Sequence, residues 1–238
     1  MRILFENKVE HSTVSAANGS LNYPPENIWD PFLWKKFKSR FGTDILTIDL
    51  AEISDLNCFF MAFHNVAIGS VVFLDGTLTP VGPSLDLASA QDIFVAYFDT
   101  ISVRRITVTI EAATGQVFVG GIGSGVFQQM PVSMTRGSEF GISDATDITQ
   151  SPAGQVSRNK APGLRLRSFT WPDLSESDRA EIDPTIVALG IGKQVYMDLY
   201  EGERSFDPPM YAVVTEPRRM TFPSANRYSL NMTFQEAR

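Results

Sequence analysis

Short runs of β-branched and aromatic residues, separated by Gly, Asp and Pro, dominate the first half of the chain. The clearest is Val103–Ile110, where apolar and polar side chains alternate with the period of a strand that buries one face. Cys58–Asn65 is a largely apolar run that also predicts a strand. Further strands are predicted at residues 45–50, 71–76, 93–98 and 116–119. No helical pattern separates these strands, which favours a β-sandwich over a parallel α/β sheet.

The second half of the chain contains a few well-patterned strands. Leu164–Trp171 alternates cleanly and is predicted to be a half-buried strand. Arg227–Phe234 is predicted to place four apolar residues on one face: Tyr228, Leu230, Met232 and Phe234. Two more strands are predicted at residues 194–200 and 210–215. Residues 131–163 are rich in Ser, Thr, Gly and Asp, and strands there are hard to place.

A single helix is predicted near residues 174–189. Ser175 and Asp178 have the spacing of a capping pair at its beginning. Pro184 has no amide hydrogen to donate, so we expect it to begin a second short helical piece rather than to continue the first.

The chain is predicted to have a mostly β fold in two domains. Residues 1–44 look irregular, because the Pro24-Pro25 and Asp30-Pro31 pairs interrupt any regular element. We expect a β-sandwich over residues 1–125 and a second β domain, which contains the helix, over residues 126–238.

The formal net charge of −7 argues against electrostatic binding to nucleic acid or anionic lipid. The densest basic stretch, Lys35–Arg40, is short and interleaved with aromatic residues. It has two interpretations: a contact for an anion or a partner, or a solvated edge around buried Phe37 and Phe41. No apolar run approaches the roughly 20 residues of a membrane-spanning helix, so we expect no membrane insertion.

The single cysteine, Cys58, excludes an internal disulfide framework and a zinc site built mainly from cysteines. Because it lies in an apolar run, we expect it to be a small buried hydrophobic side chain. Met1–Lys8 has an acidic residue where the apolar core of a signal peptide would continue. We therefore expect a protein that folds in a reducing cytoplasm.

Residues that could support catalysis are sparse. Neither His11 nor His64 lies near a nucleophile motif, and His64 is expected to cap backbone groups at a strand end. No helix start and no lysine follow Gly120–Gly125, so these glycines are expected to connect two strands rather than to bind phosphate. We expect no enzyme, no metal site and no cofactor. A calcium ion in the loop at 143–147, and paired carboxylates that meet only in the fold, stay open.

Two segments of the first half resemble the discoidin, or galactose-binding-like, β-sandwich. The first runs from Val14 to Trp34 and includes Asn27-Ile28-Trp29-Asp30, similar to the family's opening pattern of Asn, an apolar residue and Asp before a Trp. The second combines Phe63-His64-Asn65 with the later basic strand Val103–Val108. The resemblance covers residues 10–125 and implies a galactose-binding-like sandwich there.

The whole arrangement also resembles structural proteins of tailed-bacteriophage tails and baseplates, some of which join such a sandwich to a second, tail-tube-like β domain. The matching landmarks are the Gly-rich segment 120–125, the helix, and the closing strand at 228–236. This resemblance implies a non-enzymatic component of a virion tail or baseplate, made in the host cytoplasm. Its partners would be other virion tail proteins and copies of itself in a ring that closes by rotation.

The alternative function is a carbohydrate-binding module or lectin-like attachment domain, with cell-surface carbohydrate as its partner. The candidate glycan contacts are Trp29, Phe32 and Asn65, because exposed aromatic rings stack on sugars. These residues have a second interpretation, in which they pack the core.

Overall fold

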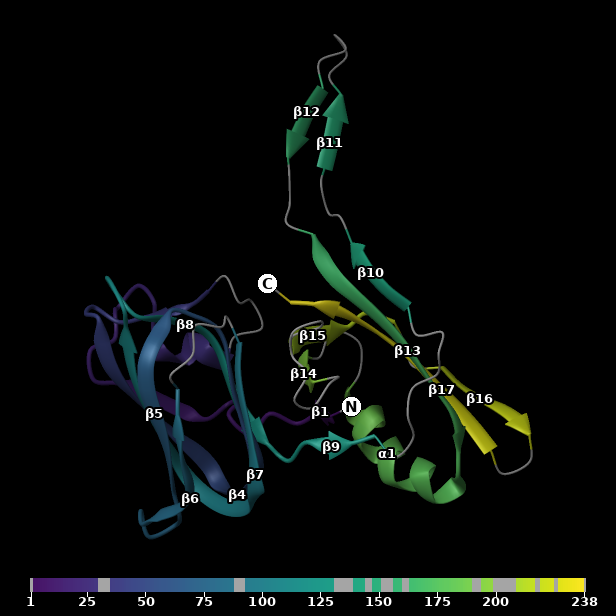
Figure 1. Cartoon of the computed structure of the whole chain (residues 1–238), viewed down its shortest axis with the longest axis horizontal. Coiled ribbons are helices and arrows are strands. Elements are labelled where there is room, and N and C mark those ends of the chain that lie inside the picture. Colours follow the sequence, from purple (N-terminus) through teal and green to yellow (C-terminus); the bar gives the residue numbers. More distant parts are fainter. Residues whose placement is uncertain are drawn as a thin grey trace. The chain divides into compact units, whose positions relative to one another are not determined.

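The computed structural model describes residues 2–29, 35–87, 93–130, 139–143, 147–150, 156–159, 163–189, 194–198, 209–216, 219–224 and 227–237. Strands dominate these residues, and α1 (Glu176–Leu189) is the α-helix among them (Figure 1). The chain forms two compact units. Unit 1 consists of Met1–Gln129 and Val195–Met210, and unit 2 of Met130–Gln194 and Tyr211–Arg238. Unit 1 thus includes Val195–Met210, which the domain boundary predicted from the sequence places in the second domain, residues 126–238.

Unit 1 is built from antiparallel strands. They are β1 (Arg2–Leu4), β2 (Thr13–Ala16), β3 (Phe37–Lys38), β4 (Thr43–His64), β5 (Val66–Leu74), β6 (Pro80–Asp86), β7 (Ile93–Ala112), β8 (Phe118–Gly125), β9 (Gln128–Gln129) and β14 (Gln194–Asp198). The main sheet has the order β3-β8-β4-β7-β5-β6, and β2 pairs with β4. Separately, β1 pairs with β9 on one edge and with β14 on the other.

The long strands β4 and β7 contribute to both layers of the sandwich. Residues 43–49 of β4 pair with β2 and with 105–111 of β7, whereas residues 58–62 pair with β8 and with 93–97 of β7. The register shifts between these stretches, and such β-bulges let a strand bend from one layer into the next. The sequence predicts separate strands at 45–50 and 58–65; the structure joins them because the bulges bend the chain without ending its pairing.

Alternating side chains from both layers form the core of unit 1. The Phe59 ring on β4 meets the Phe73 ring on β5 edge to face, with 6.3 Å between centroids. The fully buried members also include Leu46, Ile48, Leu56, Ile106, Val108 and Val119. Each Å² of apolar surface that is buried stabilises a fold by about 25 cal/mol. Burial of this core is therefore the main contribution to the stability of unit 1. The predicted mostly β fold, a sandwich followed by a second β unit with a helix, is confirmed for the described residues.

The N-terminal segment is more regular than the sequence suggests. The sequence predicts that residues 1–44 are irregular. The structure instead has β1, β2, β3 and the 3₁₀ helix η1 (Pro25–Trp29) in this segment. Ile3 and Leu4 are 0% and 2% exposed, so β1 is a buried strand of three residues. Three residues are too few for a periodic pattern to be recognised. Pro24 and Pro25 fall in the loop and η1 between β2 and β3, where no ladder hydrogen bond is lost, and Pro31 lies outside the described residues.

The glycine-rich segment is itself a strand, so the prediction that it connects two strands is wrong. In β8, a Cβ added to Gly123 would lie 2.0 Å from Cε1 of Phe60 on the paired strand β4. A Cβ on Gly125 would lie 2.4 Å from the backbone oxygen of Glu6. These glycines therefore leave room for an aromatic ring and a crossing backbone. The strand leads to β9 and not to a helix that could bind phosphate at its N-terminus.

Unit 2 is a smaller antiparallel sheet. Its strands are β10 (Glu139–Ser143), β13 (Leu164–Leu174), β15 (Met210–Val214), β16 (Arg219–Ser224) and β17 (Arg227–Glu236). β13 pairs with β10 and β17, and the other edge of β17 pairs with β15 and β16. The predicted one-sided strand is confirmed, because Tyr228, Leu230, Met232 and Phe234 are all buried. Two further strands, β11 (Asp147–Gln150) and β12 (Val156–Asn159), form a hairpin.

The helix α1 begins with the predicted cap. The Ser175 amide donates to Asp178 Oδ2 over 2.8 Å, and the Asp178 amide donates to Ser175 Oγ over 3.2 Å. This exchange satisfies two backbone donors that the first turn leaves without partners. The expectation for Pro184 is wrong, because α1 runs through it as one helix. Because Pro184 has no amide hydrogen, it donates no hydrogen bond within α1.

Candidate functional site

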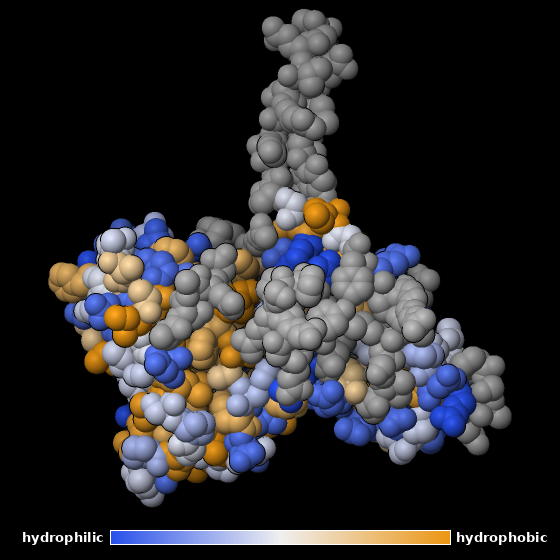
Figure 2. All heavy atoms as spheres, in the orientation of Figure 1, coloured by the Kyte–Doolittle hydropathy of each residue, from blue (hydrophilic) through white to orange (hydrophobic). Residues whose placement is uncertain are grey.

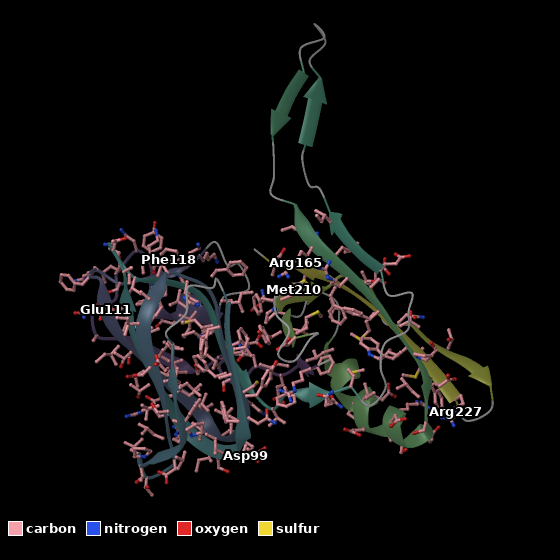
Figure 3. The ribbon with its side chains drawn as sticks, in the orientation of Figure 1. Asp99, Glu111, Phe118, Arg165, Met210 and Arg227 are labelled. Carbon is pink, nitrogen blue, oxygen red and sulfur yellow. The ribbon has the colours of Figure 1, made fainter. Side chains whose placement is uncertain are left out.

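One end of the unit 1 sandwich combines aromatic and basic side chains at its surface. Phe118 at the start of β8 and Asp99 in β7 lie at opposite ends of the unit (Figure 3). At the Phe118 end, η1 packs against β2, β3 and β8. Hydrophobic and hydrophilic residues are mixed over the visible surface of unit 1 (Figure 2). We call the following set the β3 rim: Tyr23, Lys36, Lys38, Arg40, Phe41 and Phe118.

Both edges of β3 are occupied, which fixes the direction of its side chains. On one edge Lys38 is the register partner of Phe118 in β8. On the other edge the Lys38 amide donates to the Tyr23 carbonyl over 3.4 Å, and the Ser20 amide donates to the Lys38 carbonyl over 3.0 Å. Phe37 is 0% exposed and anchors the strand in the core. Because side chains alternate along a strand, Lys38 lies on the face opposite Phe37, together with its register partner Phe118. Lys36 directly precedes β3, and its side chain reaches the Phe118 ring.

The two lysines of the rim rest on aromatic rings. Lys38 Nζ is 4.1 Å from the ring centroid of Tyr23, and Lys36 Nζ is 4.5 Å from that of Phe118. Cation–π contacts at partly exposed sites are worth about 0.5–1 kcal/mol each and restrict the side chains. Within the described part of the chain, neither ammonium group forms an ion pair with a carboxylate. The rim therefore holds positive charge that the protein does not itself neutralise by contact.

Two rim aromatics are open to solvent. Tyr23 is 37% exposed and Phe41 is 60% exposed. The expectation that Phe37 and Phe41 are both buried holds for Phe37 and is wrong for Phe41. The Ser39 hydroxyl accepts a hydrogen bond from the Phe41 amide over 3.2 Å, a local turn that directs the chain away from the strand. Phe37 is buried in the core from β3, whereas Phe41 follows this turn and is exposed.

The predicted glycan contacts fall in different places. Trp29, at the end of η1, packs partly buried on the hydrophobic core, and its ring centroid lies 5.5 Å from that of His11. Phe32 lies outside the described residues. Asn65 is half-buried next to the rim, and the structure does not bring it together with Trp29. A glycan contact by these residues stays a prediction.

The side-chain amide of Asn65 forms hydrogen bonds to the backbone at the beginning of β8. Its Nδ2 donates to the Gln116 carbonyl over 2.9 Å, and its Oδ1 accepts from the Phe118 amide over 2.8 Å. The residue thus sets the position of Phe118, on which Lys36 rests. Asn65 acts on the rim through the backbone that it holds.

The remaining reactive side chains have structural partners. His64 ends β4, and its Nδ1 accepts from the Val66 amide over 3.2 Å, which confirms the expected cap. Cys58 is buried as expected, and this burial raises the pKa of its thiol to about 12. The His11 side chain is 80% exposed and lies 3.7 Å from Glu10.

Metal-ligand clusters and membrane-spanning helices are two further kinds of feature that could indicate a function. No three His, Cys, Asp or Glu side chains of this part of the chain gather closely enough to hold a metal ion. In the loop considered for calcium, residues 144–146 lie outside the description. No helix of the described structure is long and apolar enough to cross a membrane.

The sequence indicates the positive charge of the rim but not the aromatic rings that its lysines contact. The stretch Lys35–Arg40 signals positive charge, but the rings beneath its lysines come from Tyr23, in an earlier loop, and Phe118, in a later strand. Strand pairing between β3 and β8 brings Phe118 beside the lysines. A pattern confined to neighbouring residues does not contain this pairing.

No protein-family model and no curated protein matches this sequence. Several solved carbohydrate-binding modules are similar to about half of the chain. The lectin domain of lectinolysin, solved with Lewis B antigen, matches with a TM-score of 0.45 and 11% identity over 50% of this chain and 95% of its own. A Streptococcus pneumoniae fucose-binding module matches at 0.46 and 9%, over 52% and 99%. A chitosan-binding module from a Paenibacillus chitosanase/glucanase matches at 0.45 and 11%, over 51% and 99%. At these scores the likenesses establish neither a family nor a ligand.

Proposed function

We propose that unit 1 is a non-enzymatic carbohydrate-binding module whose binding surface is the β3 rim. The observation that carries the proposal is the exposure of the Tyr23 and Phe41 side chains at one end of the unit 1 sandwich. Loops presented by a β scaffold are common places for binding residues. Aromatic rings supply large contact areas at small loss of conformational entropy, and exposed ones beside polar groups are typical of binding sites.

The cationic side chains beside these rings add hydrogen-bond donors. Lys38 lies on the Tyr23 ring, and Arg40 is exposed between Lys38 and Phe41 in the sequence. A saccharide offers both an apolar ring face and oxygen acceptors, which this combination of side chains suits. The absence of catalysis is part of the proposal. It is supported by His64, whose buried ring is engaged in a strand-end cap.

The test is binding of the full chain to a glycan array, followed by titration of the best ligands with intrinsic tryptophan fluorescence. The Tyr23→Ala/Phe41→Ala double variant is expected to weaken binding at least roughly tenfold, the size expected for loss of an aromatic anchor. Leu78→Ala is the matched control, because Leu78 is a 48% exposed hydrophobic residue outside the rim. Absence of binding to every glycan, or equal binding by the double variant and the wild type, would contradict the proposal.

A second candidate function is assembly as a structural component of a virion tail or baseplate. The observation that favours it is the hairpin β11–β12, whose strands pair only with one another among the described residues. An isolated two-stranded hairpin is at best marginally stable in water, so a partner subunit would stabilise it. Association with other tail proteins, or with copies of the chain in a ring, would supply such a partner.

The mass of the protein in solution, measured by light scattering over a concentration series, tests the assembly candidate. A discrete oligomer is expected, and replacement of residues 147–159 by a short Gly-Ser turn is expected to dissociate it. Retention of the same oligomer without the hairpin would remove the observation on which this candidate rests. A strict monomer at every concentration would argue against self-assembly in a ring.

A further inference from the structure

We propose that the β3 rim selects anionic saccharides, those that carry carboxylate or sulfate groups, through Lys36 and Lys38. This inference rests on the proposed carbohydrate-binding function and narrows its ligand class. It uses the charge of the rim, whereas the general function rests on the exposed Tyr23 and Phe41 side chains.

The first argument is the concentration of positive charge. Four of the six residues Lys35–Arg40 are cationic in a chain whose net charge is −7. Lys36, directly before β3, and Lys38, in β3, are two residues apart, so their Cα atoms are at most roughly 7 Å apart. Three acidic residues lie at this end, Glu26 in η1, Asp44 near the start of β4 and Glu111 at the end of β7. None of them forms an ion pair with either lysine in the described structure. An anion bound here would meet the ammonium groups of Lys36 and Lys38, which are not in ion pairs within the described structure.

The second argument is the support beneath each lysine. The rings of Tyr23 and Phe118 lie under the two ammonium groups at 4.1 Å and 4.5 Å. A free lysine loses much rotamer freedom when it binds a ligand, and a side chain already held on a ring loses less. A ring face can accept only one side of the ammonium group, so its remaining donors stay available for an anion. The contact thus orients the lysines for binding and leaves their charge available.

The third argument separates a local site from general attraction to polyanions. The net charge of −7 repels a polyanion at long range, and screening limits that repulsion to about 8–10 Å at physiological ionic strength. The net charge therefore does not attract a polyanion, and the proposed binding depends on local contacts at the rim. A sugar ring that stacks on Tyr23 or Phe41 would place its acidic substituent beside the lysines of the same surface.

The test compares matched polysaccharides bound to the full chain, measured by calorimetry at two salt concentrations. Dextran sulfate and polygalacturonate supply sulfate and carboxylate groups, unmodified dextran supplies a neutral backbone, and polyphosphate supplies anions without sugar. We expect binding to one or both anionic polysaccharides, weaker binding to dextran, and loss of affinity as salt is raised. The Lys36→Gln/Lys38→Gln double variant is expected to lose roughly tenfold or more, as for two charge-assisted hydrogen bonds.

Lys8→Gln is the control for each lysine, because it removes the same charge from a lysine that is already paired with Glu6 at 2.7 Å. Its affinity is expected to equal that of the wild type. Lys38→Arg, which keeps a cation that can rest on a ring, is expected to retain most of the affinity.

The outcomes distinguish this inference from the broader function. Binding to neutral glycans that the double lysine variant leaves unchanged would overturn the anionic preference and leave carbohydrate binding standing. Polyphosphate bound as tightly as the anionic polysaccharides would show a general anion surface and overturn the saccharide preference. No binding to any polysaccharide or array glycan would overturn both proposals.

Discussion

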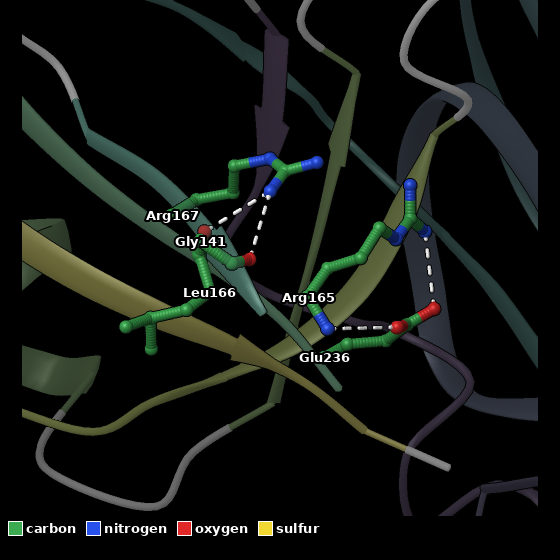
Figure 4. Close-up of polar contacts among 5 residues, drawn as sticks. All are labelled: Gly141, Arg165, Leu166, Arg167 and Glu236. Atoms are coloured by element: carbon green, nitrogen blue, oxygen red, sulfur yellow. Dashed lines mark hydrogen bonds and ion pairs between the residues drawn. The ribbon is translucent and has the colours of Figure 1, made fainter. Parts of the chain in front are cut away.

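The guanidinium of Arg165 and the carboxylate of Glu236 form a nearly buried ion pair that joins β13 to β17 (Figure 4). Arg165 Nη2 lies 3.2 Å from Glu236 Oε1, and the Arg165 amide donates to Oε2 over 3.1 Å. The side chains are 18% and 3% exposed. Next to the pair, Arg167 donates to the carbonyls of Gly141 and Leu166. One carboxylate therefore receives both a side-chain and a backbone donor at the end of the buried face of unit 2.

Glu236→Gln is expected to lower the free energy of unfolding by about 1–3 kcal/mol, because Arg165 loses its charged acceptor in a place that water reaches poorly. Urea denaturation followed by circular dichroism measures the change. Glu6→Gln is the matched control, because it breaks an exposed pair with Lys8 whose carboxylate side chain is 66% exposed. The control is expected to change stability by less than about 0.5 kcal/mol. Equal effects of the two substitutions would contradict the importance of burial.

Gly123→Ala is expected to destabilise unit 1 by about 1–3 kcal/mol or more, the usual range for an overpacked core. The added Cβ would lie 2.0 Å from the Phe60 ring, and the ring stacks on Tyr196 with centroids 4.3 Å apart, which limits its movement. Gly141→Ala is the control, because the nearest atom to its added Cβ is 3.9 Å away, in Leu166. Thermal denaturation of both variants provides the comparison. A Gly123→Ala protein as stable as the control would show that the ring can move aside.

Alkaline pH is expected to destabilise the protein through two buried groups. Burial raises the pKa of the Cys58 thiol from 9.0 to about 12. The pKa of Tyr97 is also raised above its ordinary value of 10.0, first by burial and then by the Asp198 carboxylate, which accepts from the Tyr97 hydroxyl over 3.0 Å. Above pH 9 the unfolded chain loses protons that the folded protein keeps. Stability is therefore complete below pH 9 and falls as the pH rises toward 12.

The Cys58→Ala/Tyr97→Phe double variant tests this account. Each group contributes a slope of at most about 1.4 kcal/mol per pH unit, so the variant is expected to show a flatter decline of stability above pH 9. Its stability at pH 7 is expected to be lower than that of the wild type, because the Asp198 carboxylate loses a donor. Urea midpoints between pH 8 and pH 11 provide the measurement. Parallel curves for the two proteins would assign the alkaline sensitivity to other groups.

Asn65→Ala is expected to reduce stability by about 1–2 kcal/mol and to weaken glycan binding only through displacement of Phe118. The substitution removes the hydrogen bonds to the Gln116 carbonyl and from the Phe118 amide. Asn65→Asp keeps an acceptor for the Phe118 amide but has no donor for Gln116, so an intermediate effect is expected. Denaturation and fluorescence titration of the same samples separate the two roles. Loss of binding with unchanged stability would instead make Asn65 a direct ligand contact.

The sequence by itself determines the elements whose cause is local. The alternation of Arg227–Phe234 predicts the buried face of β17, because side chains two residues apart lie on one side of any strand. The spacing of Ser175 and Asp178 predicts the beginning of α1, because a capping pair needs only one turn of chain. The charge of Lys35–Arg40 is likewise readable from the sequence.

Tertiary structure decides whatever depends on residues distant in the chain. The sequence predicts two strands where the structure has β4, because the bulges that keep β4 paired with β7 are not visible in a local pattern. The glycine-rich segment is a strand because its glycines pack against the Phe60 ring of the neighbouring strand. The candidate site is of the same kind. Lys36 and Lys38 come from one short stretch, but β3 and β8 must pair before Phe118 can support a lysine and Asn65 can hold its backbone. Local patterns fix which way a side chain faces, and only long-range packing fixes what it meets.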